Sequence, residues 1–245
     1  MFDDHLRDGQ SKRTECAATL VAKHTGVLNN PLYMQLLKEV FRADSEIDGS
    51  LQWLAEEIKN LNRYWAGSID LEVLYERVEP FILVQVERQR EFLEAKRLHD
   101  ERYKNRVCGV AIAAAMSIDN RQYQHAARMS GAKVIIQRNS NGLTQIFGCE
   151  NLDLPLLAMK IRKAELAEMR NGDRPSRFLN NEELSSNGTL PEIPQWYLDD
   201  ALLLNGSESF PDVPKSRINF RDLVQLVERH IVEVMSRHEK ETKKA

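Results

Sequence analysis

The residues nearest the start of the chain that could perform chemistry are Asp3, Asp4 and His5. Carboxylates and an imidazole can ligate Mn²⁺ or Mg²⁺, and two such ions can clamp a phosphoryl group during an in-line displacement. Three adjacent residues cannot complete a site of this kind, so further carboxylates must come from elsewhere. The alternative is a solvated terminal cluster without a ligand, which is the common state of acidic chain ends.

Asp44 is the candidate for a further ligand. It ends an amphipathic helical pattern in the segment EVFRADSEIDGS, with Glu46 and Asp48 close by. A negative charge at a helix C-terminus opposes the helix dipole by roughly 0.3–1 kcal/mol. That unfavourable placement is consistent with a functional role, and an acidic turn after a helix explains it as well.

A second candidate site is the stretch Arg138-Asn139-Ser140-Asn141-Gly142, between two runs rich in β-branched residues. Arg138 and nearby backbone amides could hold a phosphate, which would make Arg138, Asn139, Asn141 and Gly142 substrate-binding residues. Turn chemistry fully explains the Asn-Gly pair without any ligand, and spacing alone favours that simpler interpretation.

Other motifs give little. The remaining histidines are scattered and none has a metal-ligand spacing. Cys16, on a predicted helix, is more typical of packing than of a nucleophile. The sequence has no P-loop, no glycine pattern for dinucleotides and no G-x-S-x-G elbow.

Composition limits the classes of protein. The formal net charge is -3, so nothing global attracts the chain to nucleic acid or to an anionic membrane, and a polyanion site must be a local patch. Three widely spaced cysteines argue for a reducing compartment. No apolar run approaches the ~20 residues of a membrane span. We therefore expect a cytoplasmic protein without a membrane partner.

The helices and strands that must position these residues are predicted from the periodicity of apolar residues and from the Gly, Pro and capping residues that end each element. We expect an α/β fold: a helical N-terminal half, residues 1–104, followed by a small α/β domain with an antiparallel hairpin, residues 105–245. The helical half should contain helices over 14–26, 30–44 and 50–67, and a long one over 70–104 that breaks or kinks at Pro80. The second half should contain a buried strand near 107–115, a helix ending at Gly131, a hairpin over 133–147 with its turn at Asn141-Gly142, a helix over 152–172, loops over 172–219 and a final amphipathic helix.

Taken together, FDDH, ECAATLVAKHTGV and LLKEVFRADSEID resemble the DHH phosphoesterase superfamily. The similarity is to its third motif, where a strand ends in Asp-His-His before a helix rich in small residues. Within the superfamily, it is closest to a branch in which Phe or Tyr precedes Asp-His-His. The hairpin VIIQRNSNGLTQIFG resembles part of the accessory substrate-binding domain that follows the catalytic domain in these proteins.

The resemblance implies roles for particular residues. Asp3 matches the motif's Asp, Asp4 takes the place of its metal-binding His, and His5 matches the His in the active site. Asp4 and Asp44 would then ligate Mn or Mg, and Asp3 and His5 would be catalytic. Arg138 would anchor a phosphate of a nucleic acid or nucleotide.

The same resemblance implies a departure from the family, because the first two motifs, with most of the metal ligands, precede Asp-His-His. A chain that begins at the third motif is expected to be a fragment, or a scaffold that has lost catalysis. We thus expect a phosphoesterase that is incomplete as this chain, or alternatively a non-catalytic nucleotide- or protein-binding module. Missing strands would expose apolar surface, so a homo-oligomer or a partner subunit is a further expectation.

Overall fold

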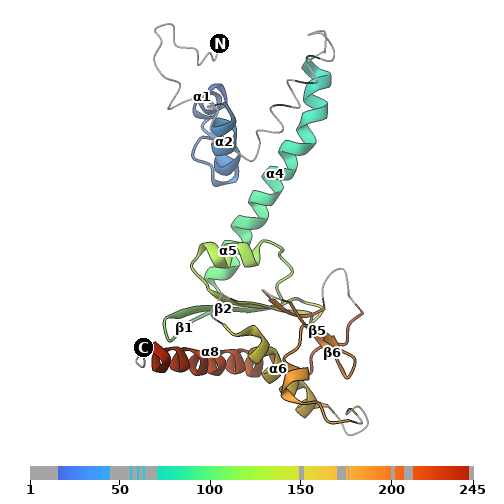
Figure 1. Cartoon of the computed structure of the whole chain (residues 1–245). Coiled ribbons are helices and arrows are strands. Elements are labelled where there is room, and N and C mark those ends of the chain that lie inside the picture. Colours follow the sequence, from blue (N-terminus) through green and yellow to red (C-terminus); the bar gives the residue numbers. More distant parts are fainter. Residues whose placement is uncertain are drawn as a thin grey trace. The chain divides into compact units, whose positions relative to one another are not determined.

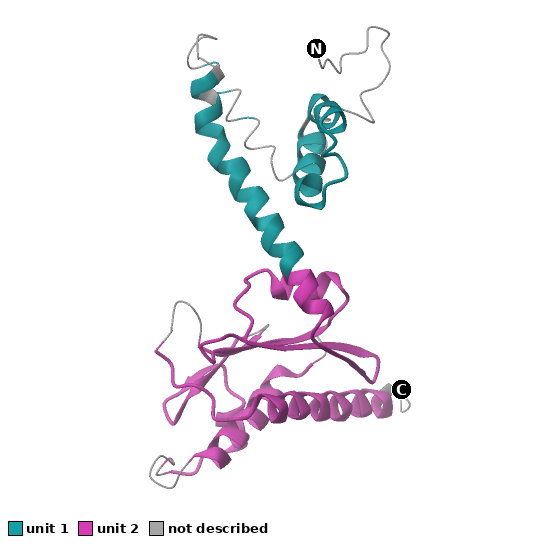
Figure 2. Ribbon diagram, turned by 180° about the vertical axis from the view of Figure 1, so that it is seen from behind, with its two compact units in different colours: residues 1–94 teal, residues 95–245 magenta. Residues whose placement is uncertain are grey.

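The computed structural model describes residues 16–44, 56, 60, 63, 71–148, 152–169, 175, 177–199, 202–206 and 212–242. The chain divides into two compact units, residues 1–94 and residues 95–245 (Figure 2). The division falls inside a helix, whereas the sequence suggested a change of character near Asn105. Helices precede a mixed sheet, so the predicted α/β class is confirmed.

The first unit contains helix α1 (Ala17–His24), helix α2 (Pro31–Asp44) and the larger part of helix α4 (Leu71–Asp100). Helix α2 begins as predicted, because Asn30 Oδ1 accepts a hydrogen bond from Leu32 N at 3.0 Å and Pro31 occupies the first helical position. The N-cap of α1 is Cys16, which is buried, as its packing role predicted.

Helix α4 runs from Leu71 to Asp100 as one element, so a break at Pro80 is wrong, whereas the alternative, a kink there, stays a prediction. A proline removes one hydrogen bond from a ladder of many, and a long helix can retain the rest. Most of the helix predicted over 50–67 lies outside the described residues.

The second unit is built on a seven-stranded sheet in the order β1-β2-β3-β4-β7-β6-β5. Strands β2 and β3 are parallel and every other neighbouring pair is antiparallel. The strands are β1 (Tyr103–Val107), β2 (Val110–Met116), β3 (Val134–Arg138), β4 (Thr144–Phe147), β5 (Gly188–Leu190), β6 (Ile193–Leu198) and β7 (Leu202–Asn205).

Helices cover both faces of this sheet (Figure 1). Helix α5 (Tyr123–Met129) connects β2 to β3 and lies on one face. Helices α6 (Leu154–Glu168) and α8 (Phe220–Thr242) lie on the other, and the short α7 (Asn181–Leu184) packs near α6. Strand β2 serves both cores: Ile112 and Ala114 face α6 and α8, and Ala113 faces α5.

The β1–β2 hairpin was not predicted. Its turn is Cys108-Gly109, with φ of 48° and 81°, and Val107 pairs with Val110. Two successive positive φ values define the tight turn that matches strand twist. The sequence placed residues up to Lys104 in a helix because β1 is a polar edge strand without apolar alternation.

The expectation of loops over 172–219 is wrong, since α7, β5, β6 and β7 occupy much of that segment. The final amphipathic helix is confirmed as α8, with Leu223, Val227 and Ile231 buried. Among the described residues, no helix is long and apolar enough to cross a membrane.

Candidate functional site

The β3–β4 hairpin forms where the sequence predicted it, with Arg138 opposite Thr144. Asn139 N donates to Leu143 O at 2.9 Å, and Gly142 N donates to Asn139 O at 3.1 Å. Gly142 has φ of 90° whereas Asn141 has no positive φ. The connection is therefore a three-residue loop closed by a left-handed glycine, and not a two-residue Asn-Gly turn.

This loop lies at the carboxyl ends of the parallel strands β2 and β3, where Met116 pairs with Arg138. The chain leaving β2 is tied to it: Ile118 N donates to Arg138 O at 3.2 Å, and Ser140 N donates to Asp119 Oδ1 at 2.9 Å. The latter bond lowers the pKa of Asp119. Open α/β sheets bind ligands outside the carboxyl ends of parallel strands, so this edge is the natural place for a site.

Arg138 is held in position at this edge. Its Nε donates to Thr144 Oγ1 at 2.8 Å and its Nη2 to Ile218 O at 3.2 Å, and its guanidinium lies 5.4 Å from the centre of the Phe220 ring. Burial lowers the pKa of Arg138, and the Glu165 carboxylate raises it. Nη1 has no hydrogen-bond partner within the described part of the chain. The result is a fixed cation with donors to spare.

The segment that supplies Ile218 is itself fixed by buried groups of the second unit. Glu165 is fully buried and accepts hydrogen bonds from Trp196 Nε1 at 2.9 Å, Ser216 Oγ at 2.7 Å and Arg217 N at 2.7 Å. Three donors on one carboxylate immobilise the chain around Ser216.

Asn205 gives this segment a second anchor. It is fully buried, its Nδ2 donates to Gln195 O at 2.6 Å and to Pro214 O at 2.9 Å, and its Oδ1 accepts from Ser216 N at 3.1 Å. The two anchors place the Lys215 side chain over the hairpin loop. The approach is close, because a Cβ atom added to Gly142 would lie 3.1 Å from Lys215 Cδ. A second cation thus stands beside Arg138's hairpin.

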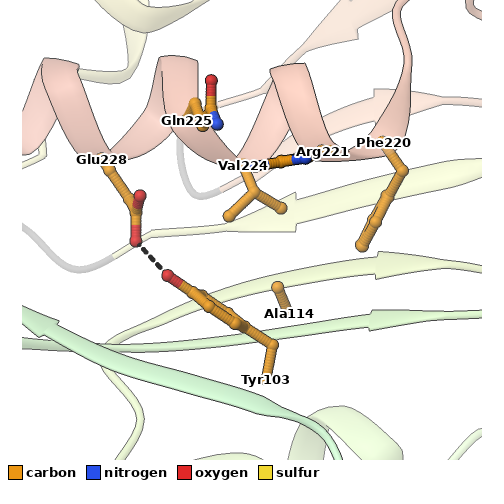
Figure 3. A pocket seen from close by; sticks show the side chains of 7 residues that line it. All are labelled: Tyr103, Ala114, Phe220, Arg221, Val224, Gln225 and Glu228. Carbon is orange, nitrogen blue, oxygen red and sulfur yellow. Dashed lines mark hydrogen bonds between the residues drawn. The ribbon is translucent and has the colours of Figure 1, made fainter.

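A groove of about 390 Å³ opens between the β1–β2 pair and the first turns of α8 (Figure 3). Its walls carry two aromatic rings, and Phe220 links it to the hairpin edge, because the same ring stands beside Arg138. Tyr103 donates its hydroxyl to Glu228 Oε1 at 2.6 Å, which raises the pKa of Tyr103. The lining residues are Tyr103, Ala114, Phe220, Arg221, Val224, Gln225 and Glu228.

The four predicted substrate-binding residues are neighbours in the structure, although they differ in what they do. Asn141 Oδ1 accepts from Leu143 N at 3.2 Å and Gly142 turns the chain, so both serve the loop. Asn139 has a buried Oδ1 without a hydrogen-bond partner among the residues described. Arg138 is the residue with the geometry to bind an anion.

The supporting residues Glu165, Asn205, Lys215 and Phe220 were not predicted. They come from elements far apart in the sequence, and no local motif marks them. The sequence does place Glu165 at the helical spacing of the apolar residues Leu157 and Ile161, and an acid on such an apolar face is a signal of a buried, paired carboxylate.

Most residues of the expected metal site lie outside the part of the chain that the structure describes. Asp3, Asp4 and His5 lie outside the described residues, and Asp44 is the last residue of α2. Across the part of the chain that the structure describes, no three His, Cys, Asp or Glu side chains gather to hold a metal ion. These residues therefore define no geometry from which a metal-dependent step can be derived.

Comparison of the chain with protein-family models, with curated proteins and with solved structures finds no match.

Proposed function

We propose that this chain is a DHH-like metal-dependent phosphoesterase acting on nucleic acid or nucleotides. Its second unit would hold a phosphate of the substrate at the edge made by Arg138 and the loop at residues 139–142. The observation that carries the proposal is the fixed guanidinium of Arg138, with unused N–H donors, at the carboxyl ends of β2 and β3.

The charge and the donors of this edge suit a phosphate. An arginine–phosphate contact is a charge-assisted hydrogen bond, about twice as strong as a neutral one. Because Thr144 and Ile218 already hold Arg138, little side-chain entropy remains to be lost on binding. Lys215 adds a second positive charge over the loop.

The proposed catalytic part rests on the family resemblance. Asp4 and Asp44 would ligate Mn or Mg, and Asp3 and His5 would lie beside the scissile phosphate. Bound ions of this kind activate water and neutralise developing phosphoryl charge. Arg138 would contribute by binding and orienting the substrate.

The rival function is a non-catalytic nucleotide- or protein-binding module. It is favoured by the groove at Phe220, because the Phe220 ring lines the groove and also lies 5.4 Å from the Arg138 guanidinium, and this arrangement requires no metal. A nucleotide could place its base in the groove and its phosphate at the guanidinium.

The phosphate-binding step is tested with adenosine monophosphate, titrated into the full chain by calorimetry. Arg138→Gln should weaken binding by about 10- to 100-fold, since one charge-assisted contact is worth about 1.5–3 kcal/mol. Arg128→Gln is the matched control, because Arg128 also lies over a ring, that of Phe147 at 5.8 Å, but on α5. Equal affinities for the two variants would remove the role of Arg138.

Catalysis is tested separately with Mn²⁺. Because a tight two-metal site needs more ligands than Asp4, His5 and Asp44 supply, Mn²⁺ should bind weakly in calorimetry. Hydrolysis of a phosphodiester that requires Mn²⁺ and is lost in Asp44→Ala would support the enzyme. Nucleotide binding without any Mn²⁺-dependent hydrolysis would support the rival. Submicromolar Mn²⁺ binding that disappears in Asp44→Ala would show a more complete metal site than we expect.

A further inference from the structure

A second pocket in the sheet unit, of about 370 Å³, is lined by residues from the end of α4, from β1 and β2 and from the end of α5. Its lining residues are His99, Lys104, Asn105, Arg106, Ala111, Ile112, Ser130 and Ala132. They include two cations, a histidine and a hydroxyl, and no carboxylate, whereas the Asn105 side chain turns to the other face, where its Nδ2 donates to Glu228 Oε1 of α8 at 2.7 Å. We call this recess the His99 pocket.

The His99 pocket is distinct from the edge at Arg138. Lys104 lies opposite Ala113 and Arg106 opposite Ala111 in the β1–β2 register, and paired residues point to the same face of a sheet. Ala113 faces α5. The two cations therefore project on the α5 side, whereas Arg138 contacts Phe220 of α8 on the other side.

The two cations of β1, Lys104 and Arg106, have few hydrogen-bond partners among the described residues. Lys104 Nζ donates to Asp100 O at 3.0 Å and lies 3.9 Å from Asp100 Oδ1. Arg106 reaches only Gly109 O, from Nη1 at 3.4 Å, and has no carboxylate partner among the described residues. A helix C-terminus accounts for Lys104, because carbonyl groups favour cations there. It does not account for Arg106, whose planar fork is suited to oxyanions.

His99 provides an independent observation. The residue is 3% exposed, and its Nδ1 has no hydrogen-bond partner in the described structure. A buried polar atom without a partner costs about 1–3 kcal/mol, so it calls for an explanation such as a ligand that completes it. Burial, and next the charge of Lys104, lower the pKa of His99, and Asp100 raises it.

Small side chains make room between these polar groups. Ala111 and Ala132 line the pocket, and the long side chains of Lys104 and Arg106 rise beside the alanines of β2. Ser130, the residue that follows α5, adds a hydroxyl donor at the rim. The recess is large enough for a phosphate group and is bordered by donors from three elements.

We propose that the His99 pocket binds a small oxyanion, namely a phosphate group, either free or as a monoester. Arg106 would donate in pairs to two of its oxygens, Lys104 would add charge, and Ser130 and His99 would complete the hydrogen bonds. This site goes beyond the substrate phosphate proposed for Arg138, because its two cations project on the opposite face of the sheet and it uses none of the same residues.

The test is a nuclear magnetic resonance titration of the full chain with sodium phosphate, against sodium chloride of equal ionic strength. Amides of Arg106, Ser130 and Ala132 should shift with saturation in phosphate and not in chloride. Arg106→Gln should weaken this binding by about tenfold or more. The matched control is Arg97→Gln, which removes an exposed arginine of α4 that pairs with Glu101 outside the pocket.

The outcomes separate this site from the one at Arg138. Shifts that persist in Arg138→Gln and weaken in Arg106→Gln support the His99 pocket, whereas shifts lost only in Arg138→Gln overturn it. Absence of saturation in the parent, or equal affinities of Arg106→Gln and Arg97→Gln, also overturns it. A parallel titration with adenosine monophosphate identifies the source: saturation by both ligands indicates a monoester site, and saturation by inorganic phosphate alone indicates a free-phosphate site.

Discussion

Asn205 is the residue whose replacement should most clearly separate packing from hydrogen bonding at the candidate site. Its side chain makes three hydrogen bonds to backbone groups, at Gln195 O, Pro214 O and Ser216 N. Asn205→Leu keeps a similar volume and removes all three. Each backbone group left without a partner costs at least about 1 kcal/mol, so the variant should lose about 3 kcal/mol of unfolding free energy. At roughly 2–4 °C per kcal/mol, the melting temperature should fall by about 6–12 °C.

The assay is urea unfolding of the full chain followed by fluorescence and circular dichroism, with thermal melting as a second measurement. The control is Asn181→Leu, an exposed position at the start of α7, which should change stability by less than about 0.5 kcal/mol. Because Asn205 anchors the segment that holds Arg138, the leucine variant should also bind adenosine monophosphate more weakly. A loss below about 1 kcal/mol would refute the reasoning, since water or relaxation would then satisfy the three groups.

Two further predictions concern the same unit. His230 is buried, with Nε2 donating to Leu152 O at 2.5 Å and Nδ1 3.3 Å from Lys160 Nζ, and burial lowers its pKa. The folded state then binds fewer protons than the unfolded state, so the free energy of unfolding should fall as pH drops below about 6.5. In urea titrations, His230→Gln should reduce the slope of unfolding free energy against pH, and an unchanged slope would contradict this. The slope that remains is assigned to His99, whose pKa is also lowered. Gly142→Ala should cost about 1 kcal/mol in the same assay because φ at this position is 90°, and a variant as stable as the parent would show that the loop relaxes.

The parts of the fold that local pattern determines were predictable. The β3–β4 hairpin follows from two β-rich runs around a loop with glycine, and α8 follows from an apolar stripe that includes Leu223 and Val227. Strand β1 was missed because an edge strand with exposed Lys104 and Arg106 lacks apolar alternation.

Strand β6 was missed for another reason. It lies in residues 172–219, which are rich in Pro, Gly, Asn and Ser and therefore favour loops, and Pro194 lies within the strand itself. In the structure Pro194 is the second residue of the strand, and the residues paired with β7 come later, at Tyr197 and Leu198. A local rule therefore gave the wrong assignment because it cannot locate the proline relative to the pairing.

The candidate site was predictable only in part. Arg138 could be singled out from its neighbours in sequence, but Ile218 O, which holds it, is 80 residues away. Glu165 and Asn205 act through the same distant segment. Such partnerships arise from the sheet order, which brings β7 beside β4, and a single sequence carries no direct record of that order.

The pairing of β4 with β7 also bears on how the sheet assembles. On one side of this pairing, strands β1 to β4 come from the continuous stretch 103–147. On the other side, strands β5 to β7 come from the continuous stretch 188–205. Each group can pair through short connections, whereas the β4–β7 ladder closes a loop from Phe147 to Leu202. Because closing a longer loop costs more chain entropy, the two groups should form first and this ladder should join them late. Until the β4–β7 ladder forms, β4 and β7 each present an unpaired strand edge. During that interval, β4 of one chain can pair with β7 of a second chain, which would give a domain-swapped dimer.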